Sequence, residues 1–140
     1  MAARPLAPSD EDIGKLVLRL TLGVLLLLHG MHKLSHGVTE IAGMLRGAHL
    51  PEALAYGAYI GEVLAPILLI AGAWTRLAAA VVVVNMLVAI GLAHAAQLLT
   101  LGPQGGWALE LQGFYLFSAL AIALMGAGRL SVGGMNGRFN

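Results

Sequence analysis

The sequence contains no cysteine and few charged residues. None of its 140 residues is cysteine, which excludes disulfide bonds, thiolate nucleophiles, CxxC redox pairs and cysteine-ligated iron–sulfur clusters within this chain. Only 11% of the residues are charged, compared with about a quarter in ordinary globular domains. The net charge of +1 gives no basic surface for nucleic acid. A redox role would therefore need a bound cofactor or a partner.

Hydrophobic residues make up most of the chain. They account for 59% of the sequence, and the mean hydropathy of +0.84 is far above that of a soluble domain. A helix needs about 20 apolar residues to cross a bilayer. The sequence therefore predicts an all-α integral membrane protein, a four-transmembrane-helix bundle formed by one domain, residues 1–140. The predicted helices are at about 13–34, 53–74, 77–99 and 107–127, with polar tails at 1–12 and 129–140.

The first predicted loop, residues 35–52, is longer than a simple connection requires. Val38, Ile41, Leu45 and His49 recur within it at helical spacing. This pattern predicts an interfacial or re-entrant helix before the proline near the end of the loop.

The basic residues predict how the chain is oriented, because cytoplasmic loops carry an excess of lysine and arginine. Five basic residues fall on the side of the termini and two on the opposite side: Arg4, Lys15, Arg76, Arg129 and Arg138 against Lys33 and Arg46. We therefore expect a multi-pass protein of the inner (plasma) membrane with both termini in the cytoplasm. A signal peptide is not expected, because acidic residues precede the first apolar segment.

Five ionisable residues interrupt the apolar segments. His29 and Lys33 share one helical stripe, and Glu62 lies near the middle of the second segment. At about 1.5 Å per residue, His94 and Glu110 fall at heights similar to His29 and Lys33. Ionisable groups inside a membrane normally face other helices, a water-filled cavity or a ligand. The five residues therefore predict a polar cavity that opens to the outer leaflet.

Pro66 lies four residues after Glu62. Proline has no backbone N–H, so the Glu62 carbonyl loses its usual helical partner. A kink and a free acceptor beside a buried carboxylate would suit a binding site.

The polar residues also have structural interpretations. Lys33 and Glu62 can form an ion pair within the bundle, and His29 and His94 can bridge helices through hydrogen bonds. Haem held by His29 and His94 is compatible with their depth, but two histidines are a weak pattern, and neither haem nor a metal ion is expected. The remaining polar residues are assigned structural roles: Arg19 snorkels or pairs with a carboxylate, Asn85 joins helices, and Arg76 and Arg129 anchor the topology.

The order of these polar residues resembles that of the DoxX family of small four-helix membrane proteins. The resemblance extends from about Leu16 to Val132. It implies a subunit of a membrane oxidoreductase system, such as a quinone-linked thiosulfate oxidoreductase, and carries over no particular catalytic residue. The segments that carry it are Leu18-Arg19-Leu20, Leu28-His29-Gly30, Lys33-Leu34, Gly61-Glu62, Gly72, Thr75-Arg76-Leu77-Ala78, Asn85-Met86, Glu110-Leu111, Tyr115 and Gly126-Ala127-Gly128-Arg129-Leu130-Ser131.

The first functional hypothesis is a quinone-associated subunit of a redox complex. A quinone site needs an apolar slot, hydrogen-bonding groups for two oxygens, and a nearby group that exchanges protons. The five residues His29, Lys33, Glu62, His94 and Glu110 supply these types. The alternatives are a non-catalytic accessory subunit of a larger complex and a small transporter or proton path. The expected partners are lipid and larger membrane subunits or further copies of the chain, and not nucleic acid.

Overall fold

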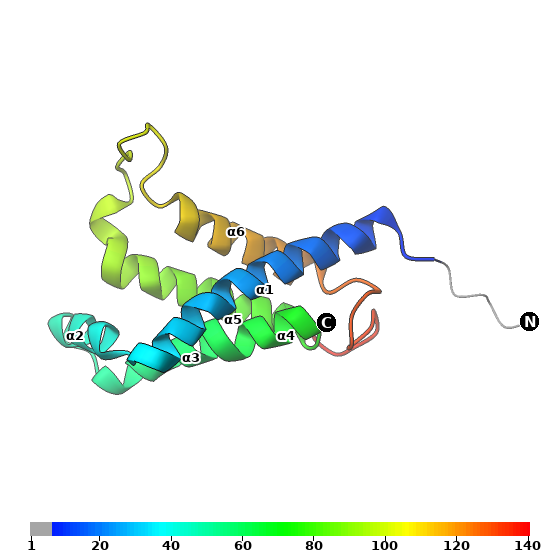
Figure 1. Ribbon diagram of the computed structural model, residues 1–140, viewed down its shortest axis with the longest axis horizontal. Coiled ribbons are helices and arrows are strands. Elements are labelled where there is room, and N and C mark those ends of the chain that lie inside the picture. The colour runs from blue at the N-terminus through cyan, green and yellow to red at the C-terminus, as the bar shows by residue number, and fades with distance from the viewer. Residues whose placement is uncertain (1–6) are drawn as a thin grey trace, which may run out of the picture.

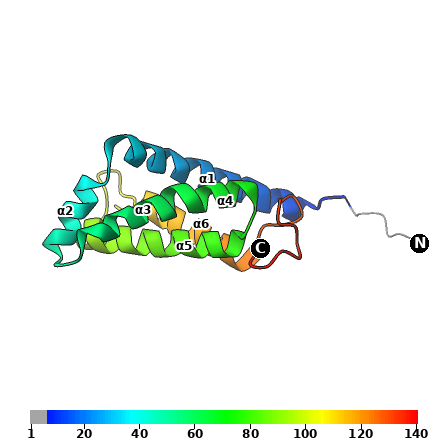
Figure 2. The same ribbon diagram turned by 90° about the horizontal axis from the view of Figure 1, so that it is seen from below.

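The computed structural model describes residues 7–140, and four helical rods lie side by side within them (Figures 1 and 2). The first rod is α1 (Asp10–His36), and the fourth is α6 (Glu110–Met125). The second rod combines η1 (Glu52–Tyr56), α3 (Gly57–Tyr59), η2 (Ile60–Leu64) and α4 (Ala65–Ala71). The third combines α5 (Thr75–Ala89), η3 (Ile90–His94) and η4 (Ala95–Gln97). Of the short pieces, η2 and η3 are π-helical and η1 and η4 are 3₁₀-helical.

Three of the rods are long and apolar enough to cross a membrane: Asp10–His36, Glu52–Ala71 and Thr75–Gln97. The prediction of an all-helical chain is confirmed. The four rods correspond to the four predicted segments, and their ends differ from the predicted ends by a few residues. The fourth helix is shorter than predicted. It has 16 residues, or about 24 Å at the usual rise, because residues 107–109 belong to the preceding turn and Gly126 ends the helix.

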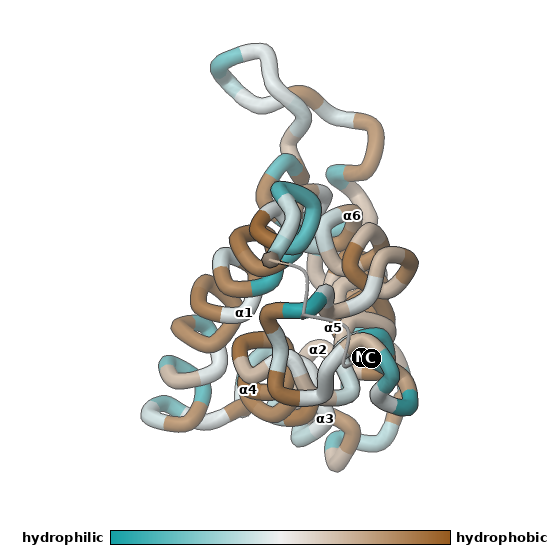
Figure 3. Tube along the Cα trace, turned by 90° about the vertical axis from the view of Figure 1, so that its right-hand side faces the viewer, coloured by the Kyte–Doolittle hydropathy of each residue, from teal (hydrophilic) through white to brown (hydrophobic). Residues whose placement is uncertain are grey.

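Hydrophobic side chains serve both the core and the outer surface of the rods. The core joins all four rods through Leu26, Leu69, Val82 and Ala119, each at most 1% exposed. Figure 3 shows hydrophobic residues along the rods. Many of the large ones are exposed, including Val84 and Phe114. An apolar exterior of this kind is what lipid-facing helices require.

The helix predicted in the first loop is present as α2 (Thr39–Gly47). Val38 and Leu45 are buried there against Ala55 and Ala58 at the start of the second rod. The loop is therefore a packed element at the end of the bundle opposite the termini (Figure 2).

The chain from Gly126 to Asn140 folds back over the ends of α4 and α5. Val132 donates a backbone hydrogen bond to Ala71 O at 3.1 Å. The side-chain oxygen of Asn140 accepts from Thr75 N at 3.2 Å and from Thr75 Oγ1 at 2.7 Å. Because Trp74 at the start of α5 gives no side-chain cap, Asn140 takes the role that an N-cap residue normally has.

Replacing Asn140 should therefore weaken α5 at its first turn. We expect Asn140→Ala to lower the free energy of unfolding in detergent by about 1 kcal/mol, the usual contribution of an N-cap side chain. Asn136→Ala, on an exposed residue of the same segment, is the matched control and should leave it unchanged. Equal effects of the two variants would show that Asn140 does not cap α5.

Two arginines close the ends of neighbouring helices. Arg19 is 1% exposed and donates from Nη1 to Leu69 O at 3.0 Å and from Nη2 to Leu130 O at 2.6 Å. Arg76 donates from Nη1 to Ala123 O at 3.1 Å and to Leu124 O at 2.8 Å, at the end of α6. Of the two predicted roles of Arg19, pairing with a carboxylate is replaced by hydrogen bonds to carbonyl groups at the end of α4 and in the C-terminal segment.

Gly72 makes room for the Arg19 guanidinium. It ends α4 with a φ of 71°, a left-handed conformation that glycine adopts at little cost. A Cβ atom at this position would overlap Arg19 Nη1. The helix end and the buried arginine therefore depend on the same glycine.

Candidate functional site

Three rods meet at a buried carboxylate. Glu62 is only 5% exposed, and Lys33 of α1 forms an ion pair with its Oε2 atom. From α5, Asn85 Nδ2 donates to Glu62 Oε1 at 3.3 Å. We call Lys33, Glu62 and Asn85 the carboxylate cluster. Each oxygen of Glu62 has a partner, as a buried carboxylate requires.

The backbone around Glu62 departs from a regular α-helix. Pro66 cannot donate to the Glu62 carbonyl, and the preceding turn, η2, is π-helical, with Ala65 N bonded to Ile60 O. Single π-helical turns occur frequently at functional sites. The predicted irregularity at this proline is therefore present as a widened turn that holds Glu62.

Two glycines let the neighbouring rods approach Glu62. A Cβ atom on Gly30 of α1 would overlap the Glu62 carbonyl, and one on Gly61 would overlap the Asn85 side chain. Close backbone approach is a frequent reason for glycine within a helix. These contacts explain how side chains from α1 and α5 reach a group buried on the second rod.

Two members of the carboxylate cluster, Lys33 and Asn85, remain partly accessible, whereas Glu62 is buried. The Lys33 side chain is 26% exposed, whereas that of Glu62 is 7% exposed. The Tyr59 hydroxyl donates to Lys33 O at 3.3 Å and adds a further polar group beside the pair.

His29 lies one helical turn before Lys33 and is exposed. Its Nδ1 atom lies 3.0 Å from Leu25 O, and because a carbonyl oxygen can only accept, Nδ1 is the donor in this contact. Its ring contacts Tyr115 of α6 edge-on, with the centroids 5.8 Å apart at 84°. Tyr115 is only 8% exposed, and this contact joins α6 to the His29 side of α1.

The structure places His94 and Glu110 in contacts of their own. His94 Nε2 lies 3.3 Å from Gln112 Nε2, and its Nδ1 lies 3.3 Å from Gln97 Oε1. Glu110 is exposed and lines a pocket of about 340 Å³ formed with the loop at residues 102–107. Of the five predicted site residues, only Lys33 and Glu62 contact each other within the described part of the chain. The hydrogen bond from Asn85 to Glu62 joins α5 to the second rod, in agreement with the role predicted for Asn85, but the sequence does not identify Glu62 as its partner.

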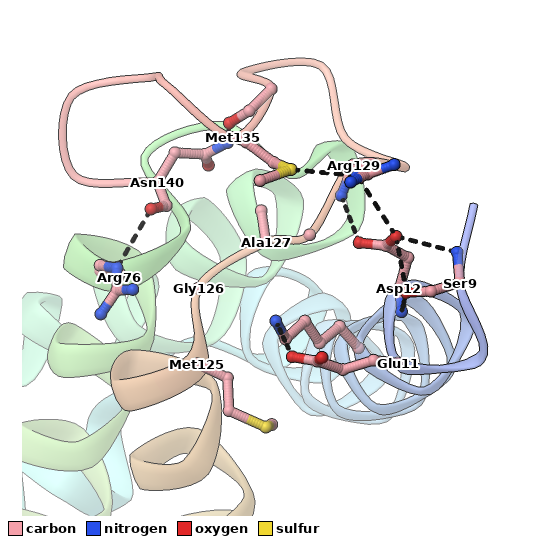
Figure 4. Close-up of a pocket in the computed structure, with 13 residues that line it drawn as sticks. Ser9, Glu11, Asp12, Arg76, Met125, Gly126, Ala127, Arg129, Met135 and Asn140 are labelled. Atoms are coloured by element: carbon pink, nitrogen blue, oxygen red, sulfur yellow. Dashed lines mark hydrogen bonds and ion pairs between the residues drawn. The ribbon is translucent and has the colours of Figure 1, made fainter. Parts of the chain in front are cut away.

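A second polar region lies at the end of the bundle where α1 begins and the C-terminal segment lies. A cavity of about 280 Å³ is formed there by the beginning of α1, the end of α6 and the C-terminal segment (Figure 4). Asp12 organises one wall: its carboxylate accepts from Ser9 N at 3.0 Å and from Arg129 N at 2.9 Å. This hydrogen bond holds Arg129, which the sequence predicts to anchor the topology, against the start of α1.

The opposite end of the bundle carries an exposed ion pair. Arg46 Nε of α2 lies 2.6 Å from Glu52 Oε1, and both side chains are largely exposed. The hydrogen bond from Arg46 to Glu52 raises the pKa of Arg46 above its usual value. Within residues 7–140, no three histidine, aspartate or glutamate side chains gather where they could hold a metal ion.

Comparison with known families identifies the chain. The family model described as DoxX matches residues 14–95, more than half of the sequence. The chain belongs to the DoxX family. The matched region of this DoxX protein contains the entire carboxylate cluster and His29, whereas α6 lies outside it. Neither a curated protein nor a solved structure matches the chain.

Membership of DoxX confirms the resemblance predicted from the polar residues. Together with three helices long and apolar enough to cross a membrane, it makes the chain an integral membrane protein. The family and the geometry therefore agree on the setting of the carboxylate cluster, which lies among membrane-spanning helices.

Proposed function

We propose that this DoxX protein is a quinone-associated subunit of a membrane redox complex and that the carboxylate cluster holds the quinone head group. The observation that carries the proposal is the buried Glu62, held by Lys33 and Asn85 on a π-helical turn. Quinone reduction moves protons as well as electrons, and a carboxylate or a histidine next to the ring exchanges them.

Each group of the cluster would have a separate task. The Lys33 ammonium and the Asn85 amide are donors and would hydrogen-bond to a quinone oxygen beside Glu62. Glu62 would exchange a proton with the quinone oxygen beside it when the ring is reduced or oxidised. His29, one helical turn from Lys33, would be a second group that delivers protons on quinone reduction and accepts them on quinol oxidation. The exposed apolar side chains near Lys33, such as Met31 and Leu34, suit the isoprenoid tail.

The proposed setting is the inner (plasma) membrane, with four crossings and both termini in the cytoplasm. The arrangement of the rods supports an even number of crossings, because Asp12 near the start of α1 contacts Arg129 just after α6. Lys15, Arg76 and Arg129 gather at this end, as the excess of basic residues on cytoplasmic sides requires. In this setting α6 would be a fourth, short crossing helix.

The test is the lipid content of the protein after purification in a mild detergent. We expect mass spectrometry of the extracted lipids to give close to one quinone per chain. An unrelated membrane protein purified from the same membranes is the control for quinone carried over with bulk lipid. A quinone content equal to that of the control would overturn the proposal. A visible spectrum of the same sample tests for haem, which the proposal does not include.

A non-catalytic accessory subunit is the second candidate. The apolar outer face of α6 favours it, because Phe114 and Phe117 are 74% and 62% exposed and aromatic side chains are frequent at subunit interfaces. In that case Lys33 and Glu62 would be a structural ion pair. A quinone-free protein that co-purifies with larger subunits, and whose deletion destabilises them, would establish this second function.

A further inference from the structure

The connection between the third rod and α6, residues 98–109, extends sideways from the bundle at the end that carries α2 (Figures 1 and 3). It contains no lysine, arginine, aspartate or glutamate. Two of its leucines are largely uncovered by protein: Leu99 is 99% exposed and Leu101 is 73% exposed. We propose that this connection lies in the interfacial layer of the bilayer and that Leu99 and Leu101 insert among the acyl chains.

The level at which α6 begins brings the connection to the bilayer surface. At the other end of the bundle α6 is level with α5, because Arg76 Nη1 donates to Ala123 O and Leu124 O. The third rod has 23 residues and α6 has 16, so α6 begins about 10 Å before the end of the third rod at the usual rise, as Figure 1 also shows. The inference rests on the proposed membrane crossing of α6. In that setting the connection leaves the third rod and returns to α6 beside lipid.

The backbone of the connection is held by hydrogen bonds of its own. They close a narrow hairpin: Gly102 N donates to Gly106 O at 2.7 Å, Ala108 N to Thr100 O at 3.0 Å, and Trp107 Nε1 to Leu98 O at 2.9 Å. Unpaired backbone groups are costly next to lipid, and this pairing lowers that cost. The hairpin ends in a tryptophan, a residue that is enriched where membranes meet water.

The connection also has a polar side. Gly102, Gln104 and Gly106 line the pocket of about 340 Å³ together with Glu110, whereas Leu99 and Leu101 do not line it. Segments that lie in a membrane interface divide their groups in this way, with apolar side chains among the acyl chains and polar groups toward water. The pocket therefore gives Glu110 access to water while the leucines contact lipid.

The surroundings favour lipid over a soluble protein as the occupant. The two helices that the connection joins carry exposed apolar side chains, among them Val88 of α5 and Leu111 of α6. Lipid covers these side chains in a membrane-spanning bundle and continues to the level of Leu99 and Leu101. The rim of a protein–protein interface is usually polar, and this connection offers no charged residue for it.

The test uses spin labels on the full-length protein. Because the chain contains no cysteine, one introduced cysteine carries the label at a chosen position. Leu99→Cys and, as the control on the polar side of the connection, Gln104→Cys would be reconstituted into phosphatidylcholine vesicles. Electron paramagnetic resonance measures the accessibility of each label to oxygen, which concentrates in lipid, and to a water-soluble nickel chelate. We expect the label at position 99 to be more accessible to oxygen and the label at position 104 to be more accessible to the nickel chelate.

Two results at position 99 would overturn the proposal. Greater accessibility to the nickel chelate would place the side chain in water. Low accessibility to both reagents would show that protein, such as a second copy of the chain, covers it. Leu101→Cys provides the same test should Leu99→Cys fail to fold.

A label on α6 separates this inference from the proposed crossing. Phe117 is largely exposed on that helix, so a label in Phe117→Cys should be accessible to oxygen if α6 crosses the membrane. With that result, a label in water at position 99 would refute only the insertion of the connection. A label at position 117 that is accessible to the nickel chelate instead would refute the crossing and the inference together. Neither result depends on whether the carboxylate cluster binds a quinone.

Discussion

Lys33→Met should lower the free energy of unfolding in detergent by about 3 kcal/mol, because it leaves a buried carboxylate without its counter-charge. Glu62 is 5% exposed, and its other hydrogen-bond partner, the Asn85 amide, carries no charge. The double variant Lys33→Met/Glu62→Gln removes both charges and keeps a polar group for Asn85. We expect it to recover most of the loss, which chemical denaturation followed by circular dichroism would measure.

An exposed ion pair provides the matched control for this experiment. Arg46 and Glu52 have nitrogen and oxygen atoms 2.6 Å apart, but their side chains are 71% and 48% exposed. Water screens such a pair, so Arg46→Met should leave the unfolding transition unchanged. If Lys33→Met were equally harmless, or if the double variant were no more stable than the single one, Lys33 and Glu62 would not act as a buried pair.

The second large effect is expected for Arg19→Met, which should lower the free energy of unfolding of the wild type by about 3 kcal/mol. The buried guanidinium donates to Leu69 O at the end of α4 and to Leu130 O in the C-terminal segment. A hydrogen bond from a charged donor contributes about 1.5–3 kcal/mol, and methionine leaves both carbonyls without this donor. Arg19→Lys should recover little, since one ammonium cannot reproduce the fork of the guanidinium.

The control for Arg19→Met is the same substitution at an exposed arginine in the C-terminal segment. Arg138 is exposed and packs on Phe139, so Arg138→Met should unfold like the wild type. Full stability of Arg19→Lys would contradict the role of the paired donors. A loss of stability in Arg19→Met below 1 kcal/mol would show that other groups close the end of α4.

The positions of the rods can be predicted from the sequence because each depends on the hydrophobic pattern of its own segment. The apolar segments and the helix in the first loop follow from hydrophobic periodicity, and α1 and α2 occur where it places them. The ion pair of Lys33 with Glu62 is one of the two interpretations that the sequence leaves open for these residues. Both residues are expensive to bury alone, so each indicates that a partner is near.

The rest of the site depends on helix rotation, which spacing along one chain does not determine. Height along the helix places His94 near Lys33, but His94 is the last residue of the π-helical η3, the 3₁₀-helical η4 follows it, and its ring lies beside Gln112. Asn85 reaches Glu62 because Gly61 has no side chain. The sequence does contain a glycine directly before Glu62, which permits a close approach of another helix. Only the packing of the rods shows that Asn85 is the residue that approaches.

The central claim is that Glu62 is part of a quinone site, and the most direct measurement is the quinone content of three purified proteins. Wild type, Glu62→Gln and Glu40→Gln would be extracted under identical conditions and analysed by mass spectrometry. Glu40 lies exposed in the first turn of α2, so Glu40→Gln makes the same chemical change away from the cluster. We predict close to one quinone per chain in wild type and Glu40→Gln and a strong loss in Glu62→Gln. Undiminished quinone in folded Glu62→Gln would contradict the claim.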